Sequence, residues 1–313
     1  MAGVDMEGLK AFLTYILTPS APVFIVGFAI VLFVPIILHF VLHGGKTFTS
    51  LPTVLLLGPS GSGKTALLTL FERGRLPPSE KPTATTTSAG PAPTHTSQAP
   101  ATVELAVSED GTSSYRDDLD AAGAVAKRFL LIDTPGHAKL RQHALSRLVP
   151  SSNSESTQSK LKALVFVVDA AALADGDALP STAAYLYDAL LALQKRMGSG
   201  RGSKAPPSIP VLIAANKLDL FTALPAALVK SNLEAELGRL RKTKSKGLLD
   251  SGIGTDEADV AEENDDWLGE YGSEKFSFKQ MLEFDIEVDV IGGNVVGDGP
   301  GVDKWWKWIA ERI

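Results

Sequence analysis

One stretch near the start of the chain limits its possible folds more than any other. The apolar run of residues 54–57 is followed by Gly58-Pro59-Ser60-Gly61-Ser62-Gly63-Lys64-Thr65, and the helix formers of residues 66–71 come next. Glycines let backbone N–H groups curl around a phosphate, and the N-terminus of the following helix adds the positive end of its dipole. A buried strand, a glycine-rich turn and a helix start are therefore predicted in that order, which is typical of a P-loop. A flexible Gly/Ser turn is the plainer alternative.

Each part of this loop has a predicted role. Lys64 would reach the β- and γ-phosphates of a nucleotide, and the hydroxyl of Thr65 would ligate Mg²⁺. The candidate nucleotide-binding residues of the loop are Gly58, Pro59, Ser60, Gly61, Ser62, Gly63, Lys64, Thr65 and Ala66.

Two further motifs each follow an apolar run that predicts a buried strand: Asp133-Thr134-Pro135-Gly136 and Asn216-Lys217-Leu218-Asp219. Asp133 would hold Mg²⁺, and the amide of Gly136 would sense the γ-phosphate. The Asp219 carboxylate can accept both N–H groups on the Watson–Crick edge of guanine, whereas adenine presents the wrong pattern there. The sequence therefore favours GTP or GDP with Mg²⁺ as ligands. A P-loop ATPase or kinase is the weaker alternative, and Asp-Thr-Pro-Gly by itself also fits a plain turn.

The order of the predicted elements gives the fold class. Alternating apolar and polar residues predict a half-buried strand at residues 101–107, and further strands are predicted at residues 128–133, 163–168, 210–215 and 284–291. Helices are predicted at residues 180–197, 219–240 and 302–313. Strands that alternate with helices predict an α/β fold, in which a mainly parallel sheet has helices on both faces.

Within one domain of residues 50–313, we expect two mobile loops. Residues 75–100 are rich in Pro, Thr and Ser, and residues 241–276 are highly charged. Neither segment has enough large apolar side chains to bury. The charged segment is either a solvated loop without a role or a docking tail. In the last helix, Trp305 and Trp306 are predicted to pack on the sheet, while Trp308 points elsewhere, toward a partner or lipid.

A long apolar stretch precedes the P-loop. Residues 23–42 carry no formal charge, and a stretch of this length can cross a bilayer core as one helix. Acidic residues ahead of it and the lack of a small-residue cleavage site argue against a signal peptide, and a buried helix is the other alternative. We expect a short N-terminal segment (residues 1–20), a transmembrane anchor (residues 21–43) and a nucleotide domain in the cytosol, where GTP and Mg²⁺ are.

Composition narrows the other possibilities. The formal net charge of −6 gives no reason to expect nucleic acid as a direct partner. The chain has no cysteine, so disulfides and thiolate metal sites are excluded. Its five scattered histidines show no metal-ligand spacing such as H-x-x-x-H next to a carboxylate, so no transition-metal site is predicted.

The three motifs in this order resemble the small Ras-like and Arf-like GTPases from about Pro52 to the C-terminus. With a membrane segment ahead of the P-loop and Asp133-Thr-Pro-Gly-His137-Ala-Lys-Leu-Arg141 as the second switch, the chain is similar to the beta-subunit family of the signal recognition particle receptor. That resemblance implies a single-pass protein of the endoplasmic reticulum membrane with a cytosolic GTPase domain. Its GTP-bound switch regions would hold the N-terminal domain of the receptor's alpha subunit for co-translational protein targeting. Whether the translocon or the ribosome is a further partner is left open.

The resemblance also implies roles for single residues. The first-switch threonine that ligates Mg²⁺ would be Thr87, which gives Thr65, Thr87 and Asp133 as the metal ligands. The last guanine-contact loop matches residues 290–294, where only backbone, as at Gly292, can make the contact. His137 stands where Ras-like proteins have the glutamine that orients the attacking water, so GTP hydrolysis is expected to be slow unaided. A membrane scaffold that keeps GTP as a structural cofactor without cycling, or another Arf-like membrane GTPase, are the alternative functions.

Overall fold

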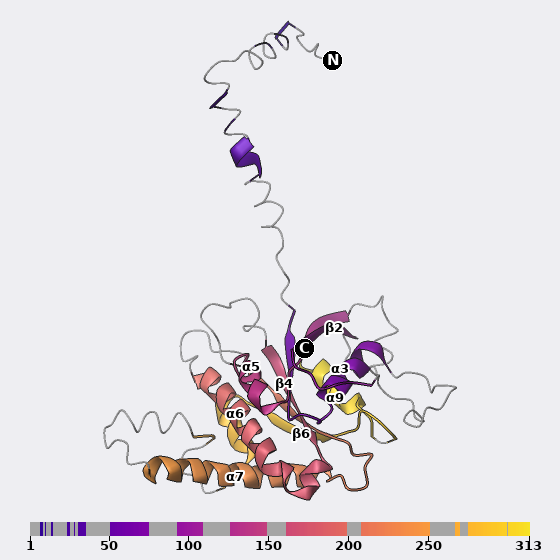
Figure 1. Ribbon diagram of the computed structural model, residues 1–313, viewed down its shortest axis with the longest axis vertical. Coiled ribbons are helices and arrows are strands. Elements are labelled where there is room, and N and C mark those ends of the chain that lie inside the picture. Colours follow the sequence, from indigo (N-terminus) through magenta and orange to yellow (C-terminus); the bar gives the residue numbers. More distant parts are fainter. Residues whose placement is uncertain are drawn as a thin grey trace. The chain divides into compact units, whose positions relative to one another are not determined.

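The computed structural model describes residues 7–8, 10, 14, 24–25, 28, 31–35, 51–74, 93–108, 126–148, 161–198, 208–250, 267–269, 275–298 and 300–313 (Figure 1). The chain divides into two units, Met1–Ser50 and Leu51–Ile313. Each unit has its own internal contacts and is described by itself.

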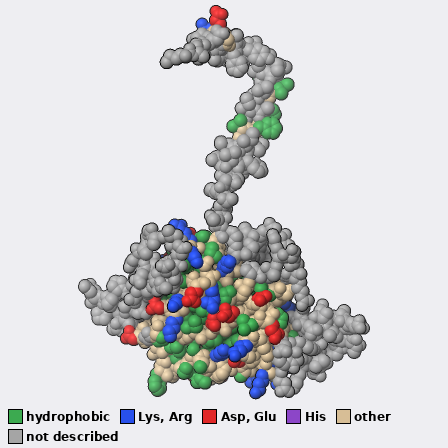
Figure 2. Space-filling view, turned by 180° about the vertical axis from the view of Figure 1, so that it is seen from behind, with side chains coloured by type: hydrophobic (Ala, Val, Ile, Leu, Met, Phe, Trp, Pro, Cys, Tyr) green, Lys and Arg blue, Asp and Glu red, His purple; other side chains and the backbone are tan. Residues whose placement is uncertain are grey.

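In the first unit, the described part of the expected anchor is helical, and its large apolar side chains are 45–73% exposed. Hydrophobic side chains stand on this segment in Figure 2. Among the residues that the structure describes, no helix has both the length and the apolar character needed to cross a bilayer. Most of residues 21–43 lie outside the described residues, and the anchor stays a prediction.

The second unit is built on a six-stranded sheet with the strand order β2-β3-β1-β4-β5-β6. The edge strand β2 is antiparallel to β3, and the other neighbouring strands are parallel. This confirms the predicted α/β fold with a mainly parallel sheet. The strands are β1 (Thr53–Leu57), β2 (Ala101–Ser108), β3 (Ala126–Asp133), β4 (Leu161–Asp169), β5 (Val211–Asn216) and β6 (Val288–Gly292).

Helices cover both faces of this sheet. One face packs against α3 (Lys64–Arg73) and α9 (Asp303–Ala310). The other face packs against the remaining helices, some of them short 3-10 segments labelled η. They are η1 (Ala138–Leu140), α5 (Arg141–Leu145), η3 (Ala172–Asp175), α6 (Ala178–Gly198), α7 (Ala226–Asp250) and η4 (Phe278–Phe284).

The apolar strands are buried on both faces because their side chains alternate in direction. In β4, Leu164, Phe166 and Val168 pack on the side of α6, whereas Val165 and Val167 pack on the side of α3. A run without polar residues is therefore required for a central strand of a parallel sheet with helices on both sides.

The parallel pairing brings the carboxyl ends of the strands to one edge of the sheet. In the strand register, Leu56 lies opposite Asp133, Asp169 opposite Asn216, and Ala215 opposite Gly292. Ligands of open α/β sheets bind at this edge. The P-loop and both other motifs begin there.

Two predicted boundaries were wrong. The helix expected at residues 219–240 begins at Ala226 and continues to Asp250, ten residues into the segment that we expected to be a loop. The first residues of the predicted helix instead form turns. The observed helix follows Pro225, a residue suited to a helix start. The strand expected at residues 284–291 starts only at Val288, because η4 extends to Phe284 and Asp285 ends it with a left-handed φ of 56°.

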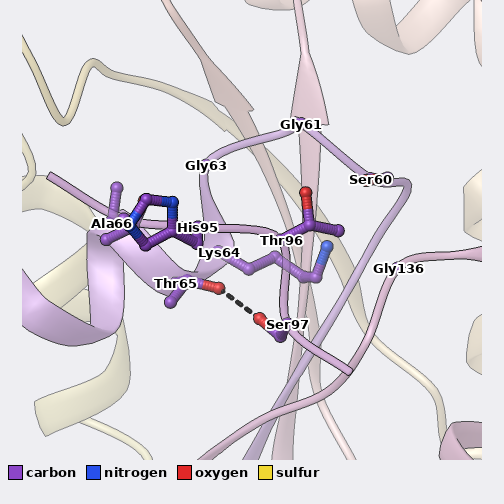
Figure 3. A pocket seen from close by; sticks show the side chains of 11 residues that line it. Ser60, Gly61, Gly63, Lys64, Thr65, Ala66, His95, Thr96, Ser97 and Gly136 are labelled. Carbon is purple, nitrogen blue, oxygen red and sulfur yellow. Dashed lines mark hydrogen bonds between the residues drawn. The ribbon is translucent and has the colours of Figure 1, made fainter. Parts of the chain in front are cut away.

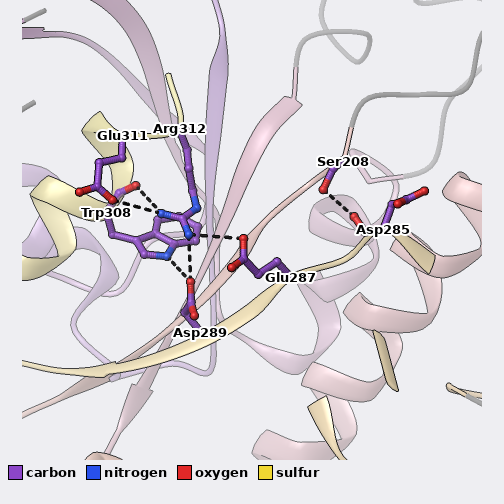
Figure 4. Close-up of polar contacts among 7 residues, drawn as sticks. All are labelled: Ser208, Asp285, Glu287, Asp289, Trp308, Glu311 and Arg312. Atoms are coloured by element: carbon purple, nitrogen blue, oxygen red, sulfur yellow. Dashed lines mark hydrogen bonds and ion pairs between the residues drawn. The ribbon is translucent and has the colours of Figure 1, made fainter. Parts of the chain in front are cut away.

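Trp308 does not point away from the protein, contrary to the prediction. Its side chain is 4% exposed, and its indole N–H donates to Asp289 Oδ2 at 2.7 Å. The guanidinium of Arg312 lies 4.2 Å from the ring centroid and bonds to the same carboxylate oxygen at 3.1 Å (Figure 4). Because α9 packs beside the edge strand β6, it buries more of its circumference than the single face that its periodicity indicates.

Surface charges of opposite sign are interspersed on the face shown in Figure 2. The exposed pairs Lys244–Asp188 and Arg128–Glu104 each have an N–O distance of 3.3 Å. Exposed pairs of this kind contribute little to stability. The fold therefore depends on its two apolar layers.

A buried arginine fixes the chain where it returns from the charged segment. Arg241 of α7 is 1% exposed, and its guanidinium lies 4.6 Å from the ring centroid of Trp267. It donates to the carbonyl of Leu268 at 3.3 Å. Gln194 of α6 also donates to the carbonyl of Trp267, at 2.8 Å. The described residues 267–269 are thus packed and hydrogen-bonded, although they lie inside the predicted loop.

We expect Arg241→Ala to lower the free energy of unfolding by about 2–4 kcal/mol, because it removes a packed side chain and leaves a buried carbonyl without its donor. The exposed neighbour Lys242 provides the control, and Lys242→Ala should change stability by less than about 0.5 kcal/mol. Urea unfolding of the detergent-solubilised chain measures both. Equal losses in the two variants would show that the cluster contributes nothing specific.

Candidate functional site

The P-loop joins β1 to α3 through glycines in conformations that other residues rarely adopt. Gly58 has φ 139°, and Gly63, the residue before α3, has φ 100°. A Cβ at Gly58 would overlap the carbonyl of Val167 in β4, and a Cβ at Gly63 would overlap the side chain of Asn216. The glycines therefore provide both the turn and the close approach to neighbouring loops.

A cavity of about 180 Å³ lies at this loop. It is lined by Ser60, Gly61, Gly63, Lys64, Thr65, Ala66, Thr94, His95, Thr96, Ser97 and Gly136. Lys64 is only 5% exposed, and its ammonium donates to the carbonyls of Gly58 and Pro59 at 2.9 and 2.8 Å. In Figure 3 the ammonium is directed between Ser60 and Gly136. A cation and a helix N-terminus together favour an anion in this cavity.

Three oxygen-bearing side chains meet beside the lysine. The Thr65 hydroxyl donates to Asp133 Oδ2 at 2.6 Å and lies 2.7 Å from the hydroxyl of Ser97. Ser97 also donates to Asp133 Oδ2, at 3.3 Å. The other carboxylate oxygen, Oδ1, is buried and has no hydrogen-bond partner among the described residues. Hydroxyl and carboxylate oxygens are the ligands that Mg²⁺ prefers, and a buried free oxygen fits such an ion.

Burial shifts the titration of both charged groups. It lowers the pKa of Lys64 to about 8, and the charge of Arg141 acts in the same direction while Asp133 opposes it. Burial also raises the pKa of Asp133, against the hydrogen bonds from Thr65 and Ser97 and the charge of Lys64. Each group thus lacks part of the solvation that water would give its charged form. Shifts of this kind are common at binding sites.

The Asp-Thr-Pro-Gly motif is fixed to the P-loop. The Thr134 hydroxyl donates to the carbonyl of Leu56 at 2.7 Å, which ties the motif to β1. A Cβ at Gly136 would lie 2.6 Å from both Lys64 Nζ and Ser60 N, so only glycine fits there. The backbone of Gly136 therefore lies directly against the cavity at Lys64, and its role as a sensor of a terminal phosphate stays a prediction.

Asn216 connects the third motif to two other loops. Its side-chain amide donates to the carbonyl of Ser62 at 2.8 Å, and its Oδ1 accepts the N–H of Val295 at 3.1 Å. The residue is 2% exposed. Asn216 thus holds the P-loop and the loop after β6 together.

The neighbouring residues of this motif lie next to the loop that follows β6. Leu218 donates its N–H to the carbonyl of Gly293 at 3.2 Å, and a Cβ at Gly292 would overlap the Leu218 side chain. Gly297 lies against Asp219, since a Cβ there would be 2.8 Å from Asp219 Oδ2. Asp219 does not line the cavity of the P-loop. The edge therefore has two neighbouring parts, a cationic one at Lys64 and a carboxylate at Asp219.

The structure does not place two of the predicted residues in this arrangement: one lies elsewhere, and the other is outside the described residues. His137 is exposed and does not line the cavity, and its Nδ1 accepts the N–H of Lys139 at 3.3 Å at the start of η1. Thr87 lies outside the described residues. The role of each stays a prediction.

Sequence reasoning missed three residues of the site. Ser97, rather than a described threonine, meets Thr65 and Asp133. Asn294 is fully buried and closes the loop after β6 by bonds to Val296, Gly297 and Gly301. Asp169, at the end of β4, forms an ion pair with Lys217. The glycines around Asn294 in the sequence could have indicated the loop that this residue closes. A single serine or aspartate, such as Ser97 or Asp169, carries no such signal.

The fold and the site define a P-loop nucleotide-binding domain whose third motif ends in a carboxylate. The chain belongs to the family described as signal recognition particle receptor beta subunit, which matches residues 49–284.

Individual relatives support this assignment. The signal recognition particle receptor subunit beta of Saccharomyces cerevisiae is 29% identical over 263 residues, which cover 84% of each chain. A solved SRb-GTP/SRX complex of the receptor from Chaetomium thermophilum is 53% identical, with a TM-score of 0.68, and the match covers 84% of this chain and 100% of the other. A second structure from that organism, SRb-GDP-Mg, is 51% identical, with a TM-score of 0.60 and coverages of 86% and 100%.

The glycines of the loop allow a matched test of its packing. Gly61→Ala places a Cβ in open space at φ 79°, so only left-handed strain of about 1–2 kcal/mol is expected. Gly63→Ala adds the overlap with Asn216, and we expect a further loss of about 1–3 kcal/mol as the buried bonds to Ser62 and Val295 weaken. The free energies of unfolding of the two variants give the difference. A smaller loss for Gly63→Ala than for Gly61→Ala would contradict the role of Asn216.

Proposed function

We propose that this chain is the GTP-binding subunit of a signal recognition particle receptor, held at the endoplasmic reticulum membrane by its N-terminal segment. The observation that carries the proposal is the convergence of three loops at one sheet edge, where Asn216 joins the P-loop to the loop after β6. The solved relatives are named as complexes with GTP, with GDP and Mg²⁺, and with SRX. Their likeness supports the same ligands here.

The phosphates would bind at the cationic part of the edge. Lys64 would exchange its bonds to the Gly58 and Pro59 carbonyls for phosphate oxygens, and the amides of the P-loop would donate to them. Mg²⁺ would be held by Thr65, Asp133 and a first-switch hydroxyl, and it would neutralise phosphate charge. Ser97 is the first-switch hydroxyl with the required neighbours among the described residues. Thr87 remains the alternative that the family resemblance implies.

The base would bind at the second part of the edge. The Asp219 carboxylate would accept both N–H groups of guanine, with Lys217 and the backbone near Gly292 and Gly297 around the purine. A site that places a carboxylate against two donors rejects adenine, because adenine would leave the carboxylate acceptors unpaired. GTP and GDP are therefore the proposed nucleotides.

Partner binding would depend on the terminal phosphate. Gly136 adjoins both Lys64 and the P-loop backbone, so a γ-phosphate at this point would fix the second switch, while Ser97 would fix the first. We propose that the two switch regions, ordered in this way, form the surface for the alpha subunit. A scaffold that never exchanges its GTP is the second candidate; trapped GTP without turnover in the purified protein would favour it.

His137 is the proposed water-orienting residue. Its ring is held by the N–H of Lys139 at the start of η1 and stands outside the cavity. It would have to turn toward the cavity to reach an attacking water. Slow hydrolysis without a partner follows from this arrangement.

The base contact can be tested by changing its hydrogen-bond pattern. Asp219→Asn replaces one acceptor by a donor, so GTP affinity should fall by roughly 100-fold or more. Xanthosine triphosphate, which has a carbonyl in place of the amino group of guanine, should then bind better than GTP. Titration calorimetry with both nucleotides measures this, with the exposed Asp175→Asn as the control. Unchanged preference for GTP would remove Asp219 from the site.

The dependence of partner binding on nucleotide is tested with Lys64→Ala. We expect this variant to lose GTP and therefore to lose the alpha subunit in a pull-down, whereas the wild-type chain should retain the alpha subunit with a non-hydrolysable GTP analogue. Full-strength partner binding by nucleotide-free protein would refute the switch. Separately, a chain without residues 1–43 should still bind GTP but should no longer float with membranes in a sucrose gradient.

A further inference from the structure

We propose that Asp169 is a positioning residue for guanine: it holds the ammonium of Lys217, so that the aliphatic stem of the lysine forms a fixed surface for one face of the purine. The inference rests on the proposed binding of GTP. It adds to that site a residue that belongs to none of the three sequence motifs.

Asp169 is itself held in place by the backbone. It is the last residue of β4 and lies opposite Asn216 in the register of β4 and β5. Its Oδ1 accepts the N–H groups of Ala171 and Ala172, both at 3.1 Å, at the start of η3. Its side chain is 19% exposed. One oxygen is thus occupied in the turn, and the other faces Lys217.

Lys217 is fixed at both ends. Its backbone has the left-handed φ of 67°, which is uncommon for a lysine and turns the chain away from β5. Both neighbours of Lys217 in the chain form backbone hydrogen bonds. The carbonyl of Asn216 accepts the N–H of Ala170, and Leu218 donates its N–H to the carbonyl of Gly293. The ammonium donates to Asp169 Oδ2. Its side chain nevertheless remains 35% exposed, so a ligand can reach it.

The ordering of the Lys217 side chain by Asp169 would raise the affinity for the base. A free lysine side chain loses considerable rotamer freedom when it is ordered. When an ion pair orders the side chain before the ligand arrives, binding no longer bears that cost. Asp169 would therefore act on the binding of the base.

The alternative is that the ion pair only stabilises the fold. Partly exposed pairs usually contribute little to stability, and the two N–H groups of η3 already account for one oxygen of Asp169. These two roles can be separated by Asp169→Asn. Asparagine retains an oxygen for Ala171 and Ala172, but it places its NH₂ group, which can only donate, against the ammonium.

The test compares a ligand that has a base with one that has none. Dissociation constants are measured for GTP and for ribose 5′-triphosphate with the full-length protein in detergent. We expect Asp169→Asn to raise the constant for GTP about tenfold, in line with the loss of a hydrogen bond to a charged group, and to leave ribose 5′-triphosphate unchanged. The matched control is Asp188→Asn, which removes the exposed ion pair with Lys244 and should change neither constant.

A double-mutant cycle shows whether Asp169 acts through Lys217. Lys217→Met should weaken GTP alone, and Asp169→Asn should have no further effect in that background. Lys217→Met also supplies the test if Asp169→Asn fails to fold. Equal weakening of both ligands, or an undiminished effect in the Lys217→Met background, would overturn the proposal. A wild-type protein that binds GTP no better than ribose 5′-triphosphate would instead refute the proposed GTP site itself.

Discussion

The arrangement of the whole edge depends on the buried amide of Asn216. It donates to the P-loop at Ser62 and accepts from Val295 after β6, so one side chain satisfies polar groups of two loops that are far apart in the sequence. With 2% exposure, water cannot replace either bond. The parallel pairing of β4 and β5 fixes the position of Asn216, and the loops then follow. The apolar core thus determines where the phosphate and base subsites lie relative to each other.

The phosphate subsite, in contrast, is electrostatically incomplete. Burial disfavours the charged forms of both Lys64 and Asp133, and the lysine satisfies its donors with backbone carbonyls. Burying a cation next to a carboxylate is costly, and Asp133 Oδ1 has no hydrogen-bond partner among the described residues. Phosphate and a divalent ion would interact favourably with these two groups. We therefore expect the same groups to provide the affinity for a metal-bound nucleotide.

The sequence was sufficient for the sheet, the P-loop and the two motifs because each follows from local composition. Continuous apolar runs predict central strands, and glycines at Gly58 and Gly63 predict a tight turn whatever the rest of the chain does. Contacts between distant segments could not be predicted in this way. The position of Ser97 depends on how a long loop returns to β2, and the burial of Trp308 depends on α9 packing beside an edge strand. The same holds for Arg241, whose partners are separated from it by a highly charged segment.

The edge strand β2 would connect the proposed first switch directly to the site. Residues 93–100 lead straight into β2, and among the described strands β2 pairs with β3 alone. Ser97 is bonded to Thr65 of the P-loop and to Asp133 at the end of that same β3. A change in what occupies Thr65 and Asp133 therefore reaches both strands of the β2–β3 pair at once. The central strands, which are paired and covered on both sides, would not follow, and the response to a ligand should be confined to this end of the sheet.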